Sequence, residues 1–183
     1  WRDWSSDVCS SDLGTHDLGF MMYNSFGHVI QQQHNELYED ILMNSARSLS
    51  SRFRKSTGTI KSWDHGKWQF PVIIDNMMNL ELLFWATRFS HDSSFYKIAV
   101  THANTTMANH YRKDYSSYHV IDYDTITGAV RAKNTHQGYS DGSAWARGQA
   151  WGLYGYVSTY RYTQNKAYRS EEHTSELQSR QYL

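Results

Sequence analysis

The sequence predicts an all-α toroid or bundle that carries one small β-hairpin. Helical segments follow one another in pairs, long loops connect them, and a single pair of short β-like runs interrupts the series. Successive helices bury their apolar stripes against one another, whereas a sandwich or a doubly wound sheet would require many more strands. The length of 183 residues fits one domain or part of a larger one.

Four segments carry helical signals. Residues 28–55 place apolar side chains at the three-and-four spacing of an amphipathic helix. Residues 76–89 are apolar almost all round, which indicates a helix that is buried on most sides. Asp92 or Ser93 can cap a third helix that continues to about residue 112. The last helix is expected over about residues 144–162.

The connections between these helices have their own signals. Residues 56–68 are interrupted by Gly and Ser and are expected to form a loop, and Pro71 prevents a helix from starting much before Val72. Residues 118–124 and 129–133 are short β-like runs on either side of a turn, which predicts a hairpin.

Three glycines, Gly148, Gly152 and Gly155, recur at helical spacing along the last predicted helix. Each glycine costs a helix roughly 1 kcal/mol relative to alanine. We therefore expect these glycines to let another backbone approach the helix closely.

Composition and charge exclude several classes of protein. The 18 Lys and Arg balance 18 Asp and Glu without a basic stripe, which argues against nucleic acid as a partner. No stretch approaches the roughly 20 apolar residues of a membrane span. The single cysteine, Cys9, cannot form an internal disulfide, and the histidines lack metal-ligand spacing such as HExxH, so we expect no metal site. Periplasm and cytoplasm are both compatible with the sequence, which does not indicate an oligomeric state.

The two ends of the chain do not resemble folded protein. Residues 3–13 (DWSSDVCSSDL) and 169–179 (RSEEHTSELQS) lack helical or strand periodicity. The two segments are related through DNA: the reverse complement of a DNA sequence that encodes the first segment encodes the second. This DNA resembles a common short-read sequencing adapter. We therefore expect residues 1–13 and 169–183 to be translated adapter around an environmental DNA insert, which leaves residues 14–168 as native protein.

Two carboxylates lie within apolar stretches. Asp75 has Ile and Met neighbours that disfavour its charged form, which predicts a raised pKa, and Asp17 is followed by Leu18 and Phe20. If both carboxylates face one cavity, their mutual repulsion leaves a proton available near neutrality, as a general acid requires. Asp75 could instead cap a helix that starts at Asn76, and one residue could do both.

Trp145, Arg147 and Trp151 cluster at the start of the last predicted helix, where Arg147 and Trp151 share one face. An aromatic ring covers the apolar face of a pyranose, and an arginine binds a carboxylate through two hydrogen bonds, so this group suits an acidic sugar. The alternative is an aromatic core helix with one surface arginine. Gly-rich phosphate motifs and a GxSxG motif are absent, so nucleotide chemistry and serine hydrolysis have no support.

The motifs HDLGFMMYNSFG, PVIIDNMMNLELLFWAT and HQGYSDGSAWARGQAWGLYGY together resemble the unsaturated glucuronyl hydrolases, glycoside hydrolase family 88. The resemblance extends over essentially all of residues 14–168. It implies an (α/α)6 barrel, of which these residues are a central part of the catalytic domain. It also implies removal of the 4,5-unsaturated uronic acid that polysaccharide lyases leave on oligosaccharides, without a metal or organic cofactor.

The resemblance assigns roles to individual residues. Asp75 would donate the proton and Asp17 would be its partner carboxylate. The residues that would line the sugar site are His119, Gln137, Trp145, Arg147 and Trp151. Gly142 stands where many relatives have a carboxylate in the sequence SDDS, and we expect this change to alter local loop hydrogen bonding rather than abolish activity.

Three alternatives remain open. One is an unsaturated rhamnogalacturonyl hydrolase, which uses similar hydration chemistry on pectin fragments, although the RGQAW and HDLGF contexts favour the glucuronyl family. Another is a non-catalytic carbohydrate-binding helical module that uses Trp145 and Arg147. The third is an inactive fragment of an enzyme. Because an incomplete toroid leaves its first and last helices unpaired, we expect the isolated segment to be inactive.

Overall fold

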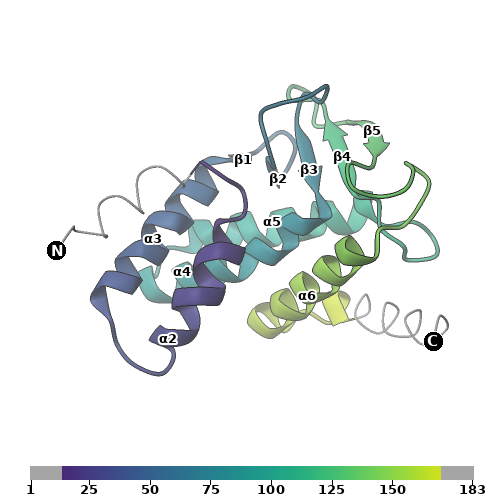
Figure 1. The fold of residues 1–183 in the computed structure, drawn as a ribbon. Coiled ribbons are helices and arrows are strands. Elements are labelled where there is room, and N and C mark those ends of the chain that lie inside the picture. The colour runs from purple at the N-terminus through teal and green to yellow at the C-terminus, as the bar shows by residue number, and fades with distance from the viewer. Residues whose placement is uncertain (1–13, 170–183) are drawn as a thin grey trace.

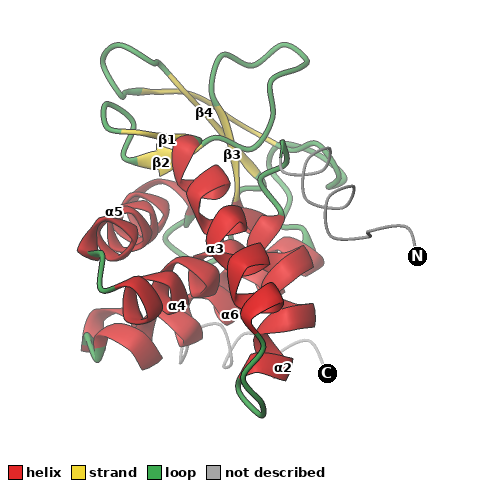
Figure 2. Ribbon diagram, turned by 90° about the vertical axis from the view of Figure 1, so that its left-hand side faces the viewer, coloured by secondary structure: helices red, strands yellow, loops and turns green. Residues whose placement is uncertain are grey.

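The computed structural model describes residues 14–169 and arranges them as a group of helices beneath a small sheet (Figure 1, Figure 2). The segments 1–13 and 170–183, where adapter sequence is expected, lie outside the described residues. None of the described helices is both long and apolar enough to cross a membrane.

The helices share one apolar core. Helix α4 (Leu80–Ser90) contacts α3 (Glu36–Ser51), α5 (Ser93–His110), α6 (Ala146–Thr163) and the π-helical segment η1 (Gly19–Gly27), which continues into α2 (His28–Ile30). The side chains of α4 that enter the core are no more than 1% exposed: Leu80, Leu82, Leu83, Phe84 and Ala86. This confirms that the apolar segment forms a helix buried on most sides.

The prediction of one helix over residues 28–55 is wrong in its extent. The chain leaves the helical conformation after Ile30, and α3 begins only at Glu36. Asn35 has an extended backbone, and its side chain accepts a hydrogen bond from the backbone N–H of Tyr38 at 3.1 Å. This N-cap satisfies a backbone donor at the start of α3, which stabilises a new helix there.

The predicted hairpin is confirmed as β4 (Val120–Tyr123) and β5 (Val130–Asn134). A strand that was not predicted, β3 (Pro71–Ile73), pairs antiparallel with β4 and makes a three-stranded sheet. Pro71 begins this edge strand, a position where a missing N–H is tolerated. A second pair, β1 (Phe53–Arg54) and β2 (Thr59–Ile60), shows that the loop predicted for residues 56–68 is partly strand.

Strand β3 continues directly into the 3₁₀-helical segment η2 (Ile74–Asn79), against which α6 packs closely. A Cβ added to Gly155 would lie 2.4 Å from the Cβ and 2.6 Å from the carbonyl oxygen of Met77. At Gly148 and Gly152 an added Cβ would lie 2.8 Å and 3.2 Å from the side chain of Ile74. The predicted close approach of another backbone is therefore confirmed at Gly155, whereas Gly148 and Gly152 make room for side chains.

Substitution of Gly155 by alanine is expected to lower the free energy of unfolding by about 1–3 kcal/mol, because the new methyl group overlaps the Met77 backbone. The sign is opposite to helix propensity, which favours alanine by roughly 1 kcal/mol. Urea unfolding followed by circular dichroism measures the effect. Gly142→Ala is the control, since a Cβ there meets nothing within 4 Å. Equal or higher stability of Gly155→Ala would contradict the close contact.

Candidate active site

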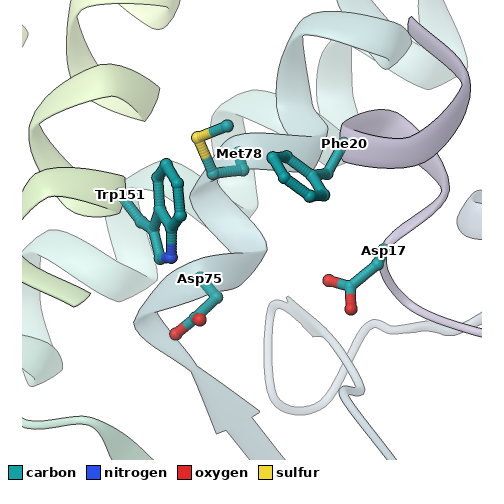
Figure 3. Close-up of a pocket in the computed structure, with 5 residues that line it drawn as sticks. All are labelled: Asp17, Phe20, Asp75, Met78 and Trp151. Carbon is teal, nitrogen blue, oxygen red and sulfur yellow. The ribbon is translucent and has the colours of Figure 1, made fainter. Parts of the chain in front are cut away.

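The structure brings Asp17 and Asp75 to one pocket of about 100 Å³, which Phe20, Met78 and Trp151 also line. Asp75 lies on the side of Trp151, and Asp17 lies on the side of Phe20 (Figure 3). The rings of Phe20 and Trp151 are 5.7 Å apart between their centroids. The two carboxylates therefore share a small cavity with aromatic walls.

Asp17 is placed by the contact between η1 and η2. Gly19 lies so close to η2 that a Cβ there would be 2.4 Å from the Cα of Asn79. The backbone N–H of Phe20 donates to the side-chain oxygen of Asn79 at 2.9 Å, which holds the start of η1 against η2. Nε2 of His16 lies 3.2 Å from Oδ1 of Asp17. These contacts orient Asp17 toward the pocket, although Asp17 is distant in sequence from Asp75.

Asp75 is placed by the sheet. The N–H of Ile74 donates to the carbonyl of His119 at 3.0 Å, which extends the pairing of β3 with β4 by one residue. Asp75 follows directly, and its Oδ2 lies 3.7 Å from Nε2 of His119. Asp75 lies within the first turn of η2, whose N-cap is Ile73, while Asn79 is the N-cap of α4. The interpretation of Asp75 as a helix cap is therefore wrong.

Burial raises the pKa of Asp75 to about 6, and the charge of Asp17 acts in the same direction. A backbone hydrogen bond and the charge of Arg147 act against this shift. Oδ2 of Asp75 is buried and has no hydrogen-bond partner among the described residues. The raised pKa that the apolar sequence neighbours predict is confirmed, and a fraction of this carboxyl group is protonated near neutral pH.

His119 is held as a neutral ring with its proton on Nε2. Its Nδ1 lies 3.0 Å and 3.2 Å from the backbone nitrogens of His136 and Gln137, and 3.4 Å from Oγ1 of Thr135. Backbone N–H groups can only donate, so Nδ1 is the acceptor and Nε2 carries the proton. Burial lowers the pKa of His119 to about 4, and its side chain is 1% exposed. An N–H donor of fixed direction therefore faces Asp75.

The remaining predicted site residues adjoin this pair. Arg147 donates to Oε1 of Gln137 at 3.1 Å, and its guanidinium lies 4.7 Å from the centroid of the Trp145 ring. The Trp145 ring is 4.5 Å from that of His119. Arg147 is exposed, and Trp145 is half-buried at the N-cap of α6. With Asp17, Asp75 and Trp151 at the pocket, all of the predicted site residues belong to one connected cluster.

Sequence reasoning missed two aromatic side chains beside this cluster. The Trp63 ring lies 6.2 Å from that of His16 and 5.5 Å from that of His136. Trp68 packs edge-on against both Trp63 and His136. The sequence signal that could have identified them is the high aromatic content of residues 63–68. Only the folded chain brings the Trp63 ring beside His16, the residue before Asp17.

Two other histidines have structural contacts. Nδ1 of His102 accepts a hydrogen bond from the N–H of Ile60 at 3.0 Å, and Nε2 of His110 lies 3.1 Å from the carbonyl of Val72. Burial lowers the pKa of each of these histidines to about 3. Both rings are therefore neutral and connect α5 to the strand segments.

The fold and the site together define an α/α-toroid protein whose pocket contains two carboxylates and aromatic walls. No protein-family model matches the chain. An unsaturated glucuronyl hydrolase of Formosa agariphila is 53% identical over 160 residues, which are 86% of this chain and 40% of that protein. An unsaturated chondroitin disaccharide hydrolase of Streptococcus pneumoniae is 36% identical over 85% of this chain and 40% of its own length.

Solved structures agree with these relatives. The crystal structure of an unsaturated glucuronyl hydrolase specific for heparin matches with a TM-score of 0.87 and 52% identity, over 89% of this chain and 44% of that chain. A variant of the Streptococcus agalactiae enzyme, complexed with dGlcA-GalNAc6S, matches with a TM-score of 0.68 and 29% identity, over 87% of this chain and 38% of that chain. The chain belongs to the unsaturated glucuronyl hydrolases, as a partial (α/α)6 barrel that spans about 40% of the curated relatives' length.

Asp75→Asn is expected to raise the free energy of unfolding at pH 7 by up to about 3 kcal/mol, since one pKa unit corresponds to roughly 1.4 kcal/mol. The folded state binds the Asp75 proton more tightly than the unfolded chain, so stability falls as pH rises from about 4 through about 6. The asparagine removes this loss. Its advantage should be present above pH 6 and absent below pH 4.

Urea unfolding at several pH values tests this expectation, and Asp40→Asn is the matched control because Asp40 is exposed on α3. An Asp75→Asn variant that is less stable than the parent chain at pH 7 would show that the buried carboxylate is satisfied in its charged form.

Proposed function

We propose that the protein to which this segment belongs removes the 4,5-unsaturated uronic acid from the non-reducing end of lyase-generated oligosaccharides. The observation that carries the proposal is the buried carboxyl group of Asp75, whose pKa is raised to about 6 in a pocket that it shares with Asp17. A carboxylic acid that keeps its proton near neutral pH can act as a general acid. The names of the relatives, which include enzymes for heparin and chondroitin fragments, support glycosaminoglycan oligosaccharides as substrates.

The reaction that fits these groups is hydration of the sugar's double bond. Asp75 transfers its proton to C4, and the C4=C5 π electrons form the new C–H bond, which leaves an oxocarbenium-like cation at C5. Water adds to C5 and returns a proton to the Asp75 carboxylate. The resulting hemiketal opens to a C5 ketone, and C1 then releases the remaining sugar as an alcohol. Because no displacement occurs at the anomeric carbon, the separation of the carboxylates does not predict a retaining or inverting outcome.

The other residues bind and orient the sugar in this proposal. Burial raises the Asp75 pKa, the charge of Asp17 adds to this shift, and Asp17 accepts hydrogen bonds from ring hydroxyls. The Nε2–H of His119 lies 3.7 Å from Oδ2 of Asp75 and is available to donate to the sugar beside it. Arg147, held over the Trp145 ring, is exposed and able to bind the sugar carboxylate. None of these roles requires a metal or an organic cofactor.

Two other functions are distinguished by experiment. An unsaturated rhamnogalacturonyl hydrolase would use the same acid on pectin fragments. A carbohydrate-binding module would use Trp145 and Arg147 without chemistry, and it would tolerate the loss of the Asp75 proton. The names of the relatives favour the glucuronyl substrate over both.

Asp75→Asn is expected to lower kcat at least about 100-fold, because an amide cannot donate the proton that C4 receives. A chimera in which residues 14–168 replace the matching segment of the Formosa agariphila relative supplies the rest of the barrel. Loss of the ultraviolet absorbance of the conjugated double bond in unsaturated glucuronyl and rhamnogalacturonyl disaccharides measures the reaction.

The parent chimera and its exposed Asp40→Asn variant are the positive controls. If Asp75→Asn consumes the substrate as fast as the parent, Asp75 is not the acid. A folded parent chimera that binds the disaccharides but consumes none of them would support the binding module.

Arg147→Lys is expected to raise KM for the unsaturated disaccharide about 10-fold, because lysine offers a point charge in place of the planar fork that matches a carboxylate. kcat should change much less, since Arg147 binds a group that is charged before and after the reaction. Steady-state kinetics of the chimera measures both constants. Arg161→Lys, at the other end of α6, is the control, and an equal rise of KM in both variants would contradict a carboxylate contact.

A further inference from the structure

We propose that Arg112 is a positioning residue, whose guanidinium joins the segment that carries His119 to the loop that carries Gln137 and Trp145. The proposal rests on the proposed function, because His119 and the Arg147–Trp145 pair are assigned to the sugar site there. Arg112 itself touches none of the carboxylates of the pocket, whose described lining comes from other residues.

The guanidinium is shared between two separate parts of the chain. Nη1 of Arg112 donates to Oγ of Ser116 at 3.1 Å and to the carbonyl of Ser117 at 2.9 Å. Nη2 donates to the carbonyls of Asp141 at 3.3 Å and Ser143 at 3.2 Å. The first pair lies two and three residues before His119, and the second lies two and four residues before Trp145. One planar group therefore fixes the distance between the two segments.

Two further contacts hold the first segment in place. The Arg112 guanidinium lies 3.8 Å from the centroid of the Tyr118 ring, a cation–π contact. From α6, Gln149 accepts from the N–H of Ser117 at 2.9 Å and donates to the carbonyl of Tyr115 at 3.0 Å. The residues before His119 are thus held by Arg112 from one side and by helix α6 from the other.

The consequence for the site follows from the hydrogen bonds of His119. Its Nδ1 accepts from the N–H groups of His136 and Gln137, which belong to the loop that Arg112 holds. If the two segments separate, Nδ1 loses these donors, and the ring becomes free to move its proton between the two nitrogens. Lysine cannot replace Arg112, because one ammonium group cannot reach four acceptors in the geometry of a planar fork.

Histidine NMR of the ¹⁵N-labelled chain tests this proposal without any activity measurement. The His119 signals, assigned by their loss in His119→Asn, report which nitrogen carries the proton. The charged or titratable groups that act on His119 or face it are Asp75, His110, His136 and Arg147. We expect a single Nε2–H tautomer between pH 5 and 8 in the parent chain, and averaged Nδ1 and Nε2 shifts in Arg112→Lys.

Arg47→Lys is the matched control, since Arg47 is exposed on α3 and donates to Asn44 there, and it should leave His119 unchanged. A parent chain in which His119 already averages between tautomers, or an Arg112→Lys spectrum identical to that of the parent, overturns the proposal. If Arg112→Lys does not fold, Gln149→Glu decides instead: it keeps an acceptor for Ser117 but loses the donor to Tyr115. Partial averaging at His119 supports the proposal, and an unchanged tautomer overturns it.

In the chimera, Arg112→Lys is expected to lower kcat about 10-fold with KM changed less than about 2-fold, because displacement of catalytic groups by an ångström can cost up to roughly 100-fold. A purely structural role would lower stability and leave kcat per folded molecule unchanged, which contradicts the proposal. If the parent chimera is inactive, the proposed function fails, while the His119 tautomer still tests whether Arg112 positions the ring.

Discussion

The antiparallel register of β3, β4 and β5 is the constraint on which the site depends. Val120 pairs with Ile73 on one side and with Asn134 on the other. Beyond these pairs, His119 meets Asp75, which lies in η2 directly after β3, and the N–H groups of residues 136 and 137, which follow β5. A slip of one residue would turn His119 to the opposite face of the sheet. The register thus determines both the partner and the tautomer of His119.

Close packing through glycine completes the site from the helical side. Gly155 on α6 and Gly19 on η1 bring their backbones against η2, so that Trp151 and Asp17 reach the pocket beside Asp75. The apolar surroundings that this packing creates also raise the Asp75 pKa. The same contacts that stabilise the fold therefore make ionisation of Asp75 at neutral pH unfavourable, and the buried carboxylate costs stability that an asparagine would restore.

Elements with a sustained hydrophobic pattern or a strong local motif could be predicted from the sequence. Helices α5 and α6 carry periodic apolar side chains, α4 is apolar almost all round, and the turn between β4 and β5 has a clear sequence signal. Strand β3 is only three residues long, so no periodicity identifies it, and the break before α3 depends on the single cap Asn35. The pocket carboxylates could be selected by their apolar neighbours, whereas Trp63 joins the cluster only through long-range ring contacts with His16 and His136 that no local pattern contains.

The usual order of proton affinity is reversed between Asp75 and His119. In water an imidazole holds its proton at a higher pH than a carboxylate does. Burial raises the pKa of Asp75 to about 6 and lowers that of His119 to about 4, because both groups avoid charge in the same apolar setting. Between about pH 4 and pH 6 the proton that the two groups could share therefore lies on the Asp75 carboxyl group, and Nδ1 of His119 stays unprotonated. A histidine that cannot take this proton leaves it on Asp75, which is the state that the proposed transfer to C4 requires, and the backbone donors on Nδ1 maintain that arrangement.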